Sequence, residues 1–155
     1  MRQIERQRRH LNEVFQKVRA LSWDAELQSH WARYLCVLVS GFIETSVRAI
    51  YLQYAEKKSD PYVASYVESQ LSRFQNPRME RIIQLASAFN PRWGNELRTS
   101  VADELKDAVD SIVILRNKIA HGESVGVTYT RILEYYQKAN KVIDLLIKQC
   151  HLPVL

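Results

Sequence analysis

Glycine, proline and cysteine are scarce in this chain of 155 residues, which contains four glycines, four prolines and two cysteines. An all-β fold with many tight turns needs more glycine and proline, so the composition argues against one. The two cysteines form neither a disulfide framework nor a metal-ligand spacing. We therefore interpret Cys36 and Cys150 as reduced packing residues of a cytoplasmic protein, and we expect no metal and no cofactor.

Long apolar runs are also missing. The longest strongly apolar run covers residues 35–39, far fewer than the roughly 20 residues that a membrane span needs. The N-terminal segment, Met-Arg-Gln-Ile-Glu-Arg-Gln-Arg-Arg, lacks the apolar core of a secretion signal. We expect a soluble protein that does not enter a membrane, with a single domain over residues 1–155.

Positive charge is concentrated near the N-terminus. The formal net charge is +5, and residues 1–20 carry six basic and two acidic side chains, whereas the rest of the chain is nearly neutral. A basic segment on a neutral body indicates a polyanionic partner such as RNA. Arg6, Arg8 and Arg9 are therefore candidate RNA contacts, or else they form the solvated face of a helix.

Apolar residues recur at steps of three and four along most of the chain, which predicts helices rather than strands. We expect helices over about 3–21, 24–56, 61–74, 77–89, 91–98, 101–121 and 128–150. The prolines at positions 61, 77 and 91 follow residues that can cap a helix, and Ser100 with Asp103 resembles a capping box. The expected fold class is all-α, an antiparallel bundle of four longer helices with short inserted helices.

The strongest candidate for chemistry is the segment Arg-Asn-Lys-Ile-Ala-His-Gly at residues 116–122. Asn117 and His121 are four residues apart and share a helix face, with Arg116 beside them. An imidazole, which gains and loses its proton near neutral pH, can move protons beside a guanidinium that stabilises a phosphorane. The alternative is that Arg116 and His121 only cap the end of a helix, where cations are common.

Glu44 is a carboxylate within the most apolar expected helix, and Arg48 follows it by four residues. Carboxylates in such surroundings usually have partners. Two interpretations stay open. In the first, Glu44 or Arg48 reaches Arg116 and His121 and fixes their geometry. In the second, Glu44 and Arg48 form an ordinary ion pair within one helix.

Aromatic residues near the start of the last expected helix also have two interpretations. Tyr129, Tyr135 and Tyr136 either stack RNA bases beside the candidate site or pack in the core. Lys118, inside the segment 116–122, is a further candidate RNA contact.

Residues 116–122 resemble the R-x4-6-H signature of HEPN domains, α-helical ribonucleases and RNA-binding modules of toxin–antitoxin, phage-defence and RNA-surveillance systems. The asparagine after the arginine and the Ala-His-Gly ending are common in that family. The resemblance is closest over residues 105–147, and Gly-Phe-Ile-Glu-Thr-Ser-Val-Arg at 41–48 is similar to the RiboL-PSP branch. Residues 60–100 carry no such likeness.

The resemblance implies metal-independent cleavage of RNA to a 2′,3′-cyclic phosphate and a 5′-hydroxyl. It also implies a homodimer in which two copies of His121 and Arg116 line one cleft. His121 is then the acid/base, Arg116 the phosphate ligand, and Asn117 the residue that orients them. We expect a toxin or phage-defence effector, with any antitoxin or regulator a separate protein.

Two other functions remain as alternatives. One is a catalytically inactive HEPN dimer that binds RNA or a partner protein without turnover. The other is a plain helical scaffold in which Arg116 and His121 only cap a helix.

Overall fold

The computed structural model describes residues 1–151, which form seven α-helices and the segments that join them. They are α1 (Arg2–Arg19), α2 (Ala25–Lys58), α3 (Pro61–Leu71), α4 (Met79–Phe89), α5 (Pro91–Ser100), α6 (Asp103–Ala120) and α7 (Tyr129–Gln149). No strand occurs within these residues. The expected all-α class is confirmed, and each expected helix is present.

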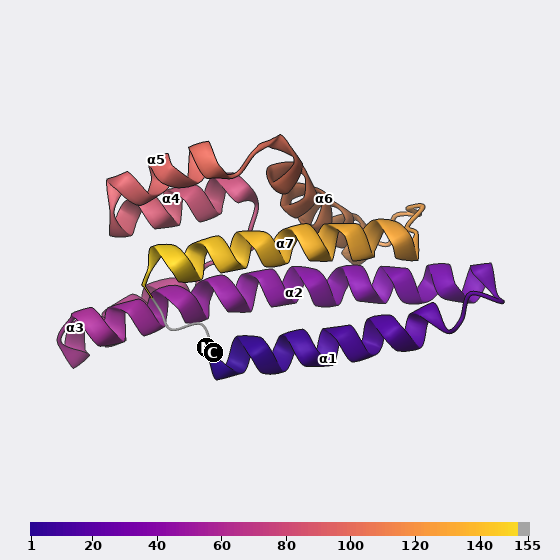
Figure 1. Ribbon diagram of the computed structural model, residues 1–155, viewed down its shortest axis with the longest axis horizontal. Coiled ribbons are helices and arrows are strands. Elements are labelled where there is room, and N and C mark those ends of the chain that lie inside the picture. Colours follow the sequence, from indigo (N-terminus) through magenta and orange to yellow (C-terminus); the bar gives the residue numbers. More distant parts are fainter. Residues whose placement is uncertain (152–155) are drawn as a thin grey trace.

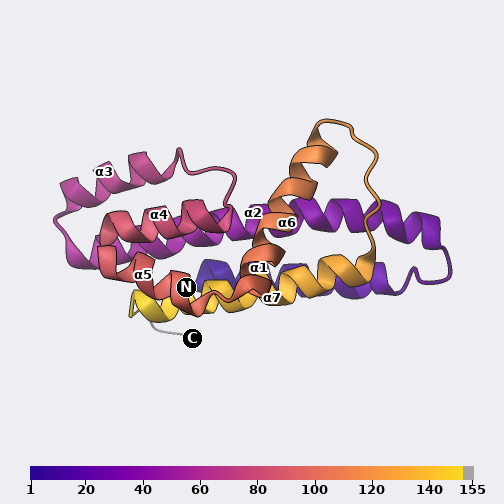
Figure 2. The same ribbon diagram turned by 90° about the horizontal axis from the view of Figure 1, so that it is seen from above.

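Helix α2 is the axis of the molecule (Figure 1). It buries apolar side chains around much of its circumference, among them Leu35, Val39 and Ile43. α1 and α7 pack along it, and α6 crosses both α2 and α7 obliquely (Figure 2). α4 and α5 pack against each other above this layer, and α3 folds back from the end of α2.

The directions of the longer helices differ from a regular antiparallel bundle. α1 and α2 are antiparallel, with a hydrogen bond of 3.1 Å from Gln7 Nε2 near the start of α1 to Thr45 Oγ1 in the second half of α2. α7 instead runs in the same direction as α2, and the Ser29 hydroxyl near the start of α2 donates to the Val127 carbonyl just before α7 (3.1 Å). The reason is that α6 and the segment after it return the chain to the end where α2 begins.

Side-chain caps begin four of the helices. Each cap accepts a backbone N–H of the first turn, as expected for short polar side chains at this position; they are Asp24, Asp60, Asn90 and Thr128. Gly122 follows the end of α6 with a φ of +73°, a left-handed conformation that glycine adopts without strain. α6 therefore ends at the expected place.

The start of α4 differs from the prediction. α4 begins at Met79 rather than at Pro77, because Asn76 adopts a left-handed φ of 52° and Pro77 lies in the irregular segment before the helix. The N-cap residue Arg78 makes no side-chain cap hydrogen bond. The Met79 N–H is satisfied instead by Asp110 Oδ1 of α6, at 2.7 Å.

The capping box predicted from Ser100 and Asp103 is wrong. Ser100 is the last residue of α5, which continues two residues beyond its expected end. The N-cap of α6 is Ala102, which has no side chain able to cap. Asp103 and Glu104 lie in the first turn of α6, where their negative charge suits the positive end of the helix dipole.

Helix α2 is, among the described residues, the one helix long and apolar enough to cross a membrane by length and composition. However, 56% of its most apolar window is buried inside the fold. Burial against α1, α6 and α7 accounts for this composition.

Candidate functional site

The segment Arg116–His121 forms the last turn of α6 and its C-cap. Arg116 Nη1 donates a hydrogen bond of 3.0 Å to Asn117 Oδ1, and the His121 N–H donates one of 3.0 Å to the Asn117 carbonyl. Arg116 and Asn117 are half-buried, whereas His121 is exposed. Asn117 therefore orients the Arg116 side chain, while its carbonyl makes the last backbone bond of α6 to His121.

The charge of Arg116 is not balanced within the described part of the chain. None of the ion pairs found among residues 1–151 includes Arg116. In the same part of the chain, neither the Arg116 nor the His121 side chain bonds to a carbonyl at the end of α6. A guanidinium and an imidazole in this arrangement are available to an anion from outside.

Helix α6 presents this turn away from the bundle. Its earlier turns are anchored by buried apolar residues such as Val109, Ile112 and Val113, and its last turns extend past α2 (Figure 2). Ile114 is one of eight large apolar side chains left exposed among the described residues, and it lies seven residues before His121, on the same helix face. Lys118 is exposed on the same turns.

The segment that follows His121 is tied to the first turns of α2. Arg33 Nη2 donates a hydrogen bond of 3.2 Å to the Val125 carbonyl, and Ser29 bonds Val127 as described above. Val127 is buried. These bonds fix the segment after α6 relative to α2. Neither Arg33 nor Ser29 was predicted to have this role.

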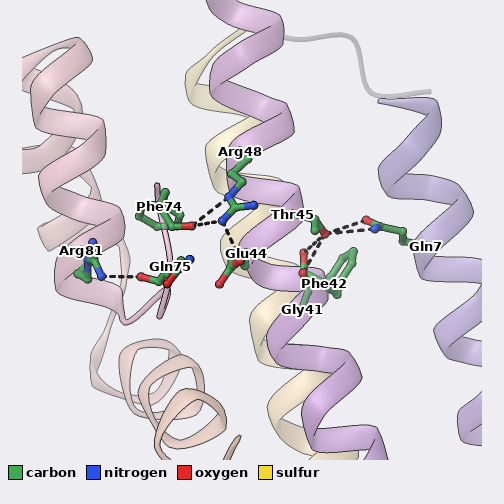
Figure 3. A network of polar contacts seen from close by, with 9 residues as sticks. All are labelled: Gln7, Gly41, Phe42, Glu44, Thr45, Arg48, Phe74, Gln75 and Arg81. Atoms are coloured by element: carbon green, nitrogen blue, oxygen red, sulfur yellow. Dashed lines mark hydrogen bonds and ion pairs between the residues drawn. The ribbon is translucent and has the colours of Figure 1, made fainter. Parts of the chain in front are cut away.

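Glu44 and Arg48 form an ion pair within α2, with Arg48 Nη2 at 3.0 Å from Glu44 Oε1. Arg48 also donates from Nε to the Phe74 carbonyl, at 3.0 Å, in the segment before α4 (Figure 3). Within residues 1–151, no hydrogen bond or ion pair joins either residue to Arg116 or His121. The contacts support the interpretation of an ordinary intrahelical pair, which here also holds a loop.

The three arginines of α1 that were predicted to contact RNA, Arg6, Arg8 and Arg9, differ in their surroundings. Arg8 is largely covered and pairs with Glu5 (3.1 Å) and with Asp144 of α7, so two carboxylates balance its charge. Arg6 and Arg9 are exposed. α1 lies on one side of the α2–α7 layer and α6 on the other, so these arginines do not line the surface around His121 (Figure 1).

The tyrosines of α7 mostly serve the core. Tyr136 is buried and stacks on Phe15 with ring centroids 5.0 Å apart, and burial raises the pKa of its hydroxyl. Tyr129 meets the edge of the same Phe15 ring at 5.9 Å. Tyr135 lies beneath the guanidinium of Arg131. For Tyr136 the core interpretation is confirmed.

Among the described residues, no group of three or more His, Cys, Asp or Glu side chains is placed to hold a metal ion.

The chain was also compared with known proteins. A family model described as RiboL-PSP-HEPN matches residues 2–151, which include all seven helices and the Arg116–His121 segment. No curated protein and no solved structure matches the chain.

Proposed function

Because the chain belongs to the RiboL-PSP-HEPN family, whose domains are often ribonucleases, we propose that it is a metal-independent endoribonuclease. The active site is the end of α6. The observation that carries this proposal is the Arg116 guanidinium, which bonds to Asn117 and pairs with no carboxylate within residues 1–151, five residues before the exposed His121. If Arg116 and His121 only capped α6, their side chains would bond to its last carbonyls.

The proposed reaction uses the RNA itself as the nucleophile. The ribose 2′-oxygen forms a bond to the adjacent phosphorus while the bond from phosphorus to the 5′-oxygen breaks. A base takes the proton of the 2′-hydroxyl, and an acid gives a proton to the leaving 5′-oxygen. Arg116 stabilises the negative charge that develops on the phosphate oxygens. The products are a 2′,3′-cyclic phosphate and a 5′-hydroxyl.

This chemistry needs both a base and an acid, whereas one copy of the segment offers one histidine. We therefore propose a homodimer in which the ends of two α6 helices face each other across a two-fold axis. One His121 then acts as base and the other as acid. The exposed Ile114 on the same face supports this arrangement, because a second copy would cover it.

In the cell, the proposed role is that of a toxin or phage-defence effector in the cytoplasm. Its activity would be restrained by a separate antitoxin or regulatory protein. The support for this role is the family membership.

The proposal is tested with labelled single-stranded RNA in the presence of a chelator. The parent protein is expected to release cyclic-phosphate products, and His121→Ala to slow their release by at least about 100-fold, because proton transfer is lost. The matched control is His10→Ala, which removes another exposed histidine, on α1. Undiminished cleavage by His121→Ala would refute the assignment, and binding without cleavage by the parent would favour the inactive RNA-binding dimer.

A further inference from the structure

A groove with a volume of about 570 Å³ lies between α3 and α4, in the part of the chain that carries no chemical motif. Apolar side chains form part of its wall, together with Tyr66, Gln70, Phe74 and two arginines, Arg73 and Arg81. No carboxylate is among the described residues that line it. The groove is therefore apolar within and cationic at its edge.

Two tyrosines of α3 stand open to solvent beside this groove. Tyr62 is 88% exposed and Tyr66 is 66% exposed, and they are four residues apart on one helix face. Neither ring contributes to the core, so burial does not explain them. Exposed aromatic rings in a row are the surface on which successive bases of a single strand stack.

The two arginines of the groove have no carboxylate partner among residues 1–151. Arg81 lies over the Phe74 ring, 5.7 Å from its centroid, and donates to the Gln75 carbonyl at 2.6 Å. Arg48 holds the Phe74 carbonyl from the other side (Figure 3). The wall of the groove is thus fixed in place before any ligand binds.

One wall of the groove, α4, is also bonded to the middle of α6. α4 begins where Asp110 of α6 binds the Met79 N–H, six residues before Arg116. Figure 2 shows α3 and the last turns of α6 projecting to the same side of α2. A strand that left the groove along this side would run toward the last turns of α6, the part of the helix that contains Arg116.

We propose that this groove binds a single-stranded segment of the RNA substrate. Tyr66 stacks a base, with Tyr62 as the next platform, while Arg73 and Arg81 pair with the phosphates. A single-stranded RNA offers both groups that suit this surface, bases for the exposed tyrosine rings and phosphates for Arg73 and Arg81. The inference rests on the proposed function in one respect, since it names a subsite for the same substrate.

The test measures binding rather than cleavage. A fluorescent ten-nucleotide single-stranded RNA is titrated into His121→Ala protein, and its anisotropy gives the Kd. Adding Tyr66→Ala is expected to raise the Kd by about fivefold or more, whereas Tyr66→Phe, which keeps the ring, leaves it unchanged. Adding Arg73→Gln is expected to weaken binding and to reduce the slope of log K against log salt by about 0.7.

Matched controls remove the same groups elsewhere. Trp23→Ala deletes an exposed aromatic ring in the turn before α2, and Arg92→Gln deletes an exposed charge on α5. Neither is expected to change the Kd. Circular dichroism of each variant verifies that the helices are intact.

The outcomes separate the two proposals. If neither the Tyr66 nor the Arg73 substitution changes the Kd for RNA, the groove is not an RNA-binding site, even if His121→Ala abolishes cleavage. A protein partner would then be the remaining ligand for the groove. Equal affinity for a blunt duplex also overturns it, because paired bases cannot stack on Tyr66. If RNA binding depends on Tyr66 but the parent protein does not cleave RNA, the groove proposal stands and the proposed ribonuclease activity is refuted.

Discussion

Asn117 is the residue on which the geometry of the candidate site depends, since its amide oxygen accepts from the Arg116 guanidinium. We expect Asn117→Ala to lower the cleavage rate by about three- to tenfold, the effect of losing one hydrogen bond. Arg116→Ala, which removes the positive charge itself, is expected to lower the cleavage rate by about 100-fold or more. Single-turnover kinetics at saturating protein measure both.

The conservative variant distinguishes a positioning role from a structural one. Asn117→Asp still accepts from Arg116 but adds a negative charge beside it, so it is expected to weaken RNA binding at low salt. Equal rates for the parent and Asn117→Ala would contradict the positioning role.

The two cysteines are buried, and burial raises the pKa of each thiol from the ordinary value of 9.0 to about 12. The thiolate is the reactive form, so we expect iodoacetamide to leave both unmodified in the native protein at pH 8 and to modify both in urea. Mass spectrometry counts the adducts. Because the folded state keeps these protons where the unfolded state loses them, stability is expected to fall as pH rises above about 9. Labelling of native Cys36 at pH 8 would contradict this expectation.

Some residue roles could be predicted from the sequence and others could not. The position of His121 after the last turn of α6 follows from periodicity and from Gly122, both of which are local signals. The engagement of Arg8 by Asp144 is not local, since 136 residues separate them. Charge counting therefore treats Arg8 like Arg6, although only Arg6 is exposed.

At the scale of elements, α4 depends on a cap from another helix. Asp110→Ala leaves the Met79 N–H without its partner and is expected to lower the free energy of unfolding by about 1–2 kcal/mol. Asp107→Ala, which removes an exposed carboxylate of the same helix, is the control and should cost much less. Urea titration followed by circular dichroism compares the two, and equal midpoints would refute the role of Asp110.

The helices themselves could be predicted because apolar spacing and capping residues act within a few positions. What could not be predicted is any feature that a distant residue decides. The start of α4 depends on Asp110, 31 residues away from Met79, and the parallel direction of α2 and α7 depends on how α6 crosses them. The one local hint of this contact was the carboxylate of Asp110, which directly follows an apolar residue of the α6 core face.

At the scale of the whole molecule, the proposed site requires two copies. We expect light scattering to give the mass of a dimer, and Ile114→Asp to reduce it to that of a monomer with loss of cleavage, because a charge would enter the apolar centre of the interface. Val37→Asp is a matched control, since Val37 has the same 39% exposure but lines a separate hollow between α1 and α2. An active monomer would contradict the composite site.

The parallel pairing of α2 and α7 also has a consequence for the order of folding. The hydrogen bond between Ser29 and Val127 closes a loop of 98 residues, whereas α1 and α2 meet through a short turn. Closing long loops is slow, so the α1–α2 hairpin is expected to form well before α7 docks. On a ribosome, the segment after His121 is therefore held in place only after Val127 has emerged and can meet Ser29. If the proposed ribonuclease activity holds, a nascent chain would therefore carry Arg116 and His121 before their surroundings are assembled, and the RNA being translated would be spared.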